Sequence, residues 1–173
     1  MTTTLFTNAH IATGEPGSTA ASTLPLQDIL VTDGVFTAFG PGLAQQYEAQ
    51  GGDLAAIEVV DLGGKLVCPP FCDTHLHLDY VFTARKPGAV NESGTLFEGI
   101  QRWSETKSDL TVDEIKQRAK IGIKKEMLHG VQLIRSHADV TDPNLTSLKA
   151  LLELKEELKD TVTLQIVSFP QEG

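Results

Sequence analysis

The feature that most constrains the fold is a regular alternation of strands and helices after about residue 65. Apolar, β-branched runs at residues 66–68, 131–136 and 162–169 are typical of strands, and patterns typical of helices lie between them. Successive parallel strands need a long crossover connection, which is usually a helix. The order therefore predicts an α/β fold with a parallel sheet.

Helix signals support this alternation. Residues 111–114 form a capping box, in which a threonine hydroxyl and a glutamate satisfy free backbone N–H groups, and Gly130 ends the helix that follows. A shorter helix is expected at residues 95–106. A third is expected to start with Asp142 as its N-cap and Pro143 at its first position. Residues 72–93 show no clear period and are predicted to form a long loop over a site.

Residues 1–66 read instead as short strands and turns. A strand is expected at residues 4–11 and a loop from Gly14 to Ser22. An Asp-Gly pair, Asp33-Gly34, lies between two β-rich runs and predicts a hairpin over residues 28–39. A second hairpin is expected over residues 57–69. We therefore predict a β-sandwich-like segment at 1–66, followed by the α/β part at 67–173.

Composition limits the partners. The formal net charge is −9, so the chain lacks the basic field that nucleic acid or an anionic membrane would need. No apolar run is long enough to span a bilayer, and the N-terminus lacks the basic and apolar regions of a signal peptide, so a cytoplasmic protein is expected. Cys68 and Cys72 are interpreted as reduced thiols, because their spacing fits a zinc knuckle poorly and two cysteines make no disulfide scaffold.

The most informative short segment contains His75, His77 and Asp79. If a strand continues to residue 77, alternation places both imidazoles on one side, where they can hold one transition metal. Asp79 has the same parity and could orient one ring. The segment follows the first strand of the parallel series, where barrel enzymes build their sites. An isolated pair of this kind can also be solvated or buried without a metal.

Several motifs together resemble a known family. Asp33-Gly34, Pro69-Pro70-Phe71 and residues 75–79 resemble the opening of the amidohydrolase superfamily. Residues 93–100, 135–140 and 169–173 look like bacterial-type cytosine deaminase, in the same order along the chain. This resemblance implies the N-terminal part of a metal-dependent (β/α)8 TIM barrel, comprising its first three βα units, preceded by the β-sandwich segment.

The resemblance also assigns roles to residues. His75 and His77 would be the first two ligands of a divalent metal ion, iron or zinc. Gln171 would hydrogen-bond the amide-like edge of a pyrimidine, since its side chain offers a donor and an acceptor, and Leu96 would pack on the ring. The alternatives are a solvated loop residue for Gln171 and a core leucine for Leu96.

Two further polar residues, His137 and Asp139, end the second strand of the series. They either support the metal site or belong to a buried hydrogen-bonded network, and neither is predicted to be a ligand. No residue of the chain matches the family's catalytic proton-shuttle glutamate, which is expected downstream.

The implied reaction is hydrolytic deamination of cytosine to uracil and ammonia by metal-activated hydroxide. Alternatives are an amidohydrolase acting on a related ring, such as isoguanine or an aminotriazine, and a catalytically inactive binding relative. The chain is expected to be an incomplete portion, inactive alone, with the rest of the barrel on the same or another chain. Its expected partners are a small nucleobase and, when intact, further copies of itself.

Overall fold

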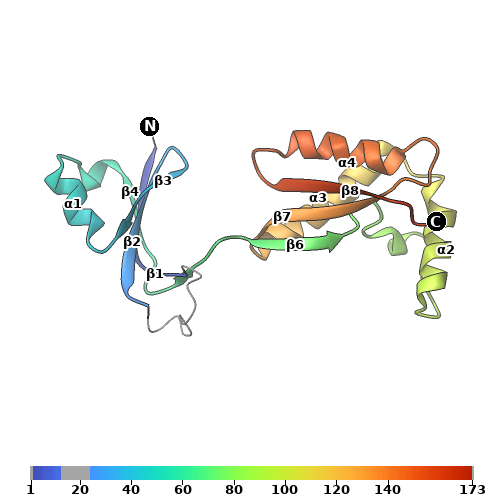
Figure 1. Ribbon diagram of the computed structural model, residues 1–173, viewed down its shortest axis with the longest axis horizontal. Coiled ribbons are helices and arrows are strands. Elements are labelled where there is room, and N and C mark those ends of the chain that lie inside the picture. The colour runs from blue at the N-terminus through green and yellow to red at the C-terminus, as the bar shows by residue number, and fades with distance from the viewer. Residues whose placement is uncertain (1, 13–23, 173) are drawn as a thin grey trace. The chain divides into compact units, whose positions relative to one another are not determined.

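A computed structural model describes residues 2–12 and 24–172, and the chain divides into two compact units, Met1–Pro69 and Pro70–Gly173 (Figure 1). The loop predicted from Gly14 to Ser22 lies outside the described residues. Among the residues that are described, no helix combines the length and apolar character that crossing a bilayer requires.

The first unit contains a five-stranded sheet in the order β3-β2-β1-β4, with β5 also paired to β1. The strands are β1 (Thr3–Ile11), β2 (Leu26–Thr32), β3 (Val35–Gly40), β4 (Glu58–Asp61) and β5 (Leu66–Val67). The predicted hairpin between β2 and β3 is confirmed, with Asp33 and Gly34 at φ angles of 50° and 79°. Positive φ at both central residues is what a tight two-residue turn requires.

The second predicted hairpin is wrong, because β4 and β5 both run parallel to β1 and do not pair with each other. Asn8 adopts a φ of 57° within β1, its side chain donates to Asp61, and its carbonyl accepts from Gly64 N. These contacts hold the Gly63-Gly64 turn beside β1. The chain therefore leaves β4 and pairs again with β1 as β5.

The β-sandwich expectation also needs correction. In the described residues the strands form one mixed sheet, because β1 pairs with β2 along one edge and with β4 and β5 along the other. Helix α1 (Leu43–Ala49) packs against this sheet, and a short 3-10 helix, Leu54–Ala56, precedes β4. Among the described residues of this unit, the buried apolar ones are Leu5, Ala9, Ile29 and Leu43.

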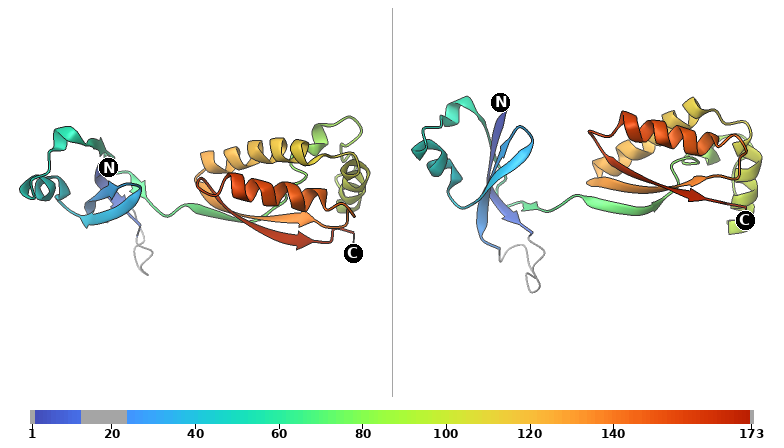
Figure 2. Two further views of the ribbon diagram at one scale, coloured as in Figure 1. Left: turned by 90° about the horizontal axis from the view of Figure 1, so that it is seen from above. Right: turned by 45° about the horizontal axis from the view of Figure 1, so that its top comes forward.

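The second unit is a parallel three-stranded sheet, β6-β7-β8, with the helices over residues 112–128 and 146–157 on one face (Figure 2). Its elements are β6 (Phe71–Leu76), a 3-10 turn (Thr83–Arg85), α2 (Leu96–Lys107), α3 (Val112–Leu128), β7 (Val131–Asp139), α4 (Thr146–Glu157) and β8 (Thr163–Phe169). The predicted parallel α/β organisation is confirmed. Within the described residues the sheet stays open and forms no closed barrel.

The first strand of this sheet is not where the sequence predicted it. Residues 66–68 were expected to start the parallel series, but Leu66–Val67 pairs with β1 in the other unit. The series starts at Phe71–Leu76, most of which was predicted to be loop. Pro69 and Pro70 lack backbone N–H groups and interrupt the strand pattern, so the ladder resumes only beyond them.

The sequence predicted the start of one helix correctly and the start of another three residues too early. The Thr111 hydroxyl accepts from Glu114 N at 3.2 Å, as the capping box predicted. The last helix, however, starts at Thr146 instead of residue 143. The Asp142 carboxylate accepts from the N–H groups of Asn144 and Thr146, so it forms a turn before the helix and still satisfies one free donor.

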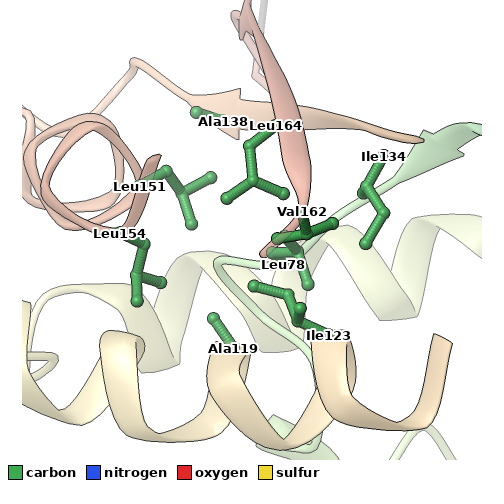
Figure 3. Packing of buried hydrophobic residues seen from close by; sticks show 9 residues of the cluster. All are labelled: Leu78, Ala119, Ile123, Ile134, Ala138, Leu151, Leu154, Val162 and Leu164. Atoms are coloured by element: carbon green, nitrogen blue, oxygen red, sulfur yellow. The ribbon is translucent and has the colours of Figure 1, made fainter. Parts of the chain in front are cut away.

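The core of the second unit lies between the sheet and helices α3 and α4. Figure 3 shows the apolar side chains that gather there. They are Leu78, Ala119, Ile123, Ile134, Ala138, Leu151, Leu154, Val162 and Leu164. On the opposite face of the sheet Leu133, Arg135 and Gln165 are exposed. The helices therefore bury one face and hold the carboxyl ends of the strands at a common edge.

Candidate functional site at the carboxyl ends of the strands

Three histidines gather where β6 and β7 end. The ring centroids of His75 and His77 are 5.2 Å apart, and His137 lies 4.1 Å from His75 and 5.5 Å from His77. The predicted proximity of His75 and His77 is therefore present, although β6 ends at Leu76. His137 joins them because parallel strands bring their carboxyl ends to one edge.

The environment of His77 favours its neutral imidazole form. Burial, followed by the nearby charges of His75 and His137, lowers the pKa of His77. In the described part of the chain, the Nδ1 atoms of His77 and His137 are buried without a hydrogen-bond partner. Neutral imidazole nitrogens with free lone pairs have the donor chemistry that iron and zinc accept. Yet residues 2–12 and 24–172 contain no group of three or more His, Cys, Asp or Glu side chains placed to hold an ion.

Asp79 does not orient a histidine ring, contrary to the sequence expectation. Its buried carboxylate accepts from Asp139 N at 2.9 Å and from Tyr80 N at 3.1 Å. Strand alternation no longer applies there, because the chain turns after Leu76. Burial raises the pKa of Asp79 to about 6, and its contacts join the end of β6 to the end of β7.

Asp139 belongs to a hydrogen-bonded network. Its Oδ2 accepts from Trp103 Nε1 at 2.6 Å and from Lys107 Nζ at 3.3 Å, while its Oδ1 accepts from Thr141 N and Oγ1. Burial raises the pKa of Asp139, but these hydrogen bonds and the Lys107 charge outweigh it, so the net shift is downward. Of the two readings left open, the network describes Asp139, whereas His137 lies with the other histidine rings.

A pocket of about 450 Å³ is lined by Tyr80, whose ring stacks on His77, and by both residues predicted to bind substrate. Its wall includes Leu96 from the start of α2 and Gln171 from the segment after β8. Leu96 is 73% exposed, which excludes a core role, and Gln171 is half-buried. The structure thus brings together two residues that are 75 positions apart in the sequence (171 − 96).

Aromatic rings connect the pocket to the histidines. Tyr80 lines the pocket, stacks on His77 at 4.7 Å between ring centroids, and lies 4.8 Å from the ring of Trp103. Burial raises the pKa of Tyr80 to about 12, so its phenol stays protonated. Sequence reasoning missed both aromatics. Trp103 could have been found from its spacing, because positions i and i+7 share one helix face and Leu96 is seven residues earlier.

A braced loop forms another part of the pocket wall. Asn91 Nδ2 donates to Thr95 O at 2.9 Å, and Asn91 Oδ1 accepts from Gly94 N at 2.8 Å. The Glu98 carboxylate accepts from the backbone N–H groups of Glu92 and Ser93 and from the Ser93 hydroxyl. This bracing fixes the entry to α2 and with it the place of Leu96.

Several known proteins are similar to this chain in fold and in sequence. The structure of 5-methylcytosine deaminase from Klebsiella pneumoniae liganded with 5-fluorocytosine matches with a TM-score of 0.79 and 40% identity, covering 98% of this chain and 37% of that one. N-isopropylammelide isopropyl amidohydrolase of Pseudomonas sp. (strain ADP) is 36% identical over 118 residues, which are 66% of this chain and 29% of that relative. Pterin deaminase of Rhizobium rhizogenes (strain K84 / ATCC BAA-868) is 27% identical over 148 residues, 83% of this chain and 31% of that relative.

The chain thus spans about a third of the length of these relatives. The model of the amidohydrolase family matches residues 58–173, which include β6, β7, β8 and every histidine and pocket residue described above. The resemblance drawn from the motifs is therefore confirmed at the level of the family. This chain belongs to the amidohydrolase family.

Proposed function

We propose that the chain forms part of a hydrolase that deaminates a pyrimidine-type ring, converting cytosine to uracil and ammonia. One observation carries the proposal: Leu96 and Gln171 line a single pocket whose Tyr80 ring stacks on His77. A ring held in that pocket would lie against Tyr80, the residue that stacks on His77. The 40% identity to a deaminase of 5-methylcytosine, over nearly the whole chain, supports the same substrate class.

His75 and His77 are the residues that would hold a divalent ion, iron or zinc. Two observations fit this role: the Nδ1 atom of His77 has no hydrogen-bond partner, and the two ring centroids are 5.2 Å apart. A bound ion would supply hydroxide at neutral pH by lowering the pKa of its water. Because a catalytic site needs three or more protein ligands, we propose that the remaining ligands and the proton-shuttle glutamate come from the rest of the barrel, on the same or another chain.

The chain's own residues bind and orient the ring. The Gln171 amide has both a donor and an acceptor, and the pyrimidine edge presents the complementary pair. Leu96 provides an apolar surface for the flat face of the ring. Tyr80 and Trp103 add aromatic walls that exclude water, which strengthens each hydrogen bond within the pocket.

The test is Gln171→Ala in the intact protein, with Gln132→Ala as a matched control at the exposed start of β7. Losing a hydrogen bond that leaves a buried partner unpaired costs roughly 1–3 kcal/mol, so kcat/KM for cytosine should fall about 5- to 150-fold. Gln132→Ala should leave it unchanged. Kinetics within twofold of wild type for Gln171→Ala would remove Gln171 from the site.

A related ring is the second candidate, because N-isopropylammelide isopropyl amidohydrolase is 36% identical over two thirds of this chain. Comparing kcat/KM for cytosine, isoguanine and an aminotriazine separates the two proposals. An inactive binding relative would bind one of these rings and release no ammonia from any of them.

A further inference from the structure

A single partly buried ammonium group, that of Lys107, joins two segments that line the substrate pocket. Lys107 lies in the last turn of α2, and its side chain is 13% exposed. Its Nζ donates to Thr141 Oγ1 at 2.6 Å, to Glu172 Oε1 at 2.6 Å and to Asp139 Oδ2 at 3.3 Å. An ammonium has three N–H donors, and here three acceptors from two segments meet them, Asp139 and Thr141 at the end of β7 and Glu172 after β8.

These partners connect the parts of the chain that carry the pocket residues. Leu96 lies in the first turn of the helix that ends with Lys107, and Gln171 directly precedes Glu172. Asp139 ends β7 and also accepts from Trp103 Nε1, in the middle of α2. Helix α2 is therefore held to the end of β7 at two points and to the segment after β8 at one.

We propose that Lys107 is a positioning residue that fixes the Gln171 segment against α2 and so sets the distance across the pocket between Gln171 and Leu96. Its effect on substrate rests on the proposed function, whereas the tether itself does not. The segment after β8 has left the ladder, which ends at Phe169. The ion pair with Glu172 is then a principal restraint on where the Gln171 amide lies.

Burial disfavours the charged form of Lys107, but its hydrogen bond to Glu172 and the Asp139 charge more than offset this, so its pKa is raised. The ammonium therefore stays charged across the working pH range. A neutral side chain of similar length would leave Asp139 with one donor fewer and would remove the ion pair of Glu172, which would keep only its hydrogen bond with Ser104.

The experiment compares Lys107→Met with Lys116→Met in the intact protein. Lys116 is a matched control, because its side chain is 14% exposed and also contacts two carboxylates, Glu153 and Glu157, on α4. Hydrogen exchange is measured over residues 168–172, together with kcat and KM for cytosine. Glu172→Gln is a second variant that removes the charge from a more exposed partner, so that loss of folding in Lys107→Met leaves the test intact.

We expect faster exchange in residues 168–172 for Lys107→Met and Glu172→Gln and not for Lys116→Met. We also expect KM to rise roughly tenfold while kcat changes little, because binding of the ring is weakened. Unchanged exchange would overturn the tether, and faster exchange with unchanged KM would overturn its role in the pocket. If wild type releases no ammonia from cytosine while the exchange result holds, the proposed function fails and the tether stands.

Discussion

Ser136→Ala tests whether the turn after β6 is held by one buried hydroxyl. Ser136 is 1% exposed in β7, and its Oγ accepts from Leu78 N at 3.0 Å. Leu78 is fully buried, so removing the hydroxyl leaves its N–H without this partner. An unsatisfied buried donor costs about 1–3 kcal/mol, and a missing oxygen adds only a small cavity. We therefore expect the free energy of unfolding to fall by about 1–3 kcal/mol.

The assay is denaturant unfolding of the intact protein, with Ser168→Ala as the control. Ser168 lies on the neighbouring strand β8, and its side chain is exposed, so the same chemical change there should stay within about 0.5 kcal/mol of wild type. Equal stability of the two variants would refute the reasoning and would mean that the Leu78 N–H finds water or another acceptor.

Three further results are expected. Leu154→Ala, in the core, should cost about 2–5 kcal/mol, whereas Leu152→Ala, which is 51% exposed, should cost far less in the same unfolding assay. The Ser93 hydroxyl and nearby N–H groups lower the pKa of Glu98 from 4.5 to about 2. The ionised Glu98 carboxylate therefore stabilises the fold above pH 4.5, and this contribution is lost as the pH falls toward 2. In Glu98→Gln the melting temperature should depend less on pH between 4.5 and 2 than it does in wild type. Residues 1–173 expressed alone with iron or zinc should release no ammonia from cytosine and should aggregate, because the open sheet exposes its edges; steady turnover from a monodisperse sample would contradict this.

Local chemistry explains which elements could be predicted from the sequence. The Asp33-Gly34 turn and the threonine cap at residue 111 depend on neighbours in the chain and have the predicted form, whereas the Glu114 carboxylate pairs with Lys86. The hairpin expected at residues 57–69 failed because strand pairing depends on a distant partner. Nothing within that segment indicates that Asn8 holds its turn beside β1.

The site shows the same division. Strand periodicity predicted that His75 and His77 lie on one side, and their rings are 5.2 Å apart, but the strand ends at Leu76 and does not itself place His77. Periodicity could not predict that Tyr80 connects these rings to Trp103, because Tyr80 follows a turn where alternation has ended. The contacts of Lys107 lie 32 to 65 residues away in the sequence and emerge only from the folded chain.

The most direct test of a metal-dependent deaminase is the metal content of the intact protein and of its His75→Ala/His77→Ala variant, measured with ammonia release from cytosine in the same samples. His129→Ala, at the exposed end of α3, is the matched control. We expect wild type and the control to hold iron or zinc and to release ammonia, and the double variant to lose both. An unchanged metal stoichiometry in the double variant would contradict the assignment of His75 and His77 as ligands.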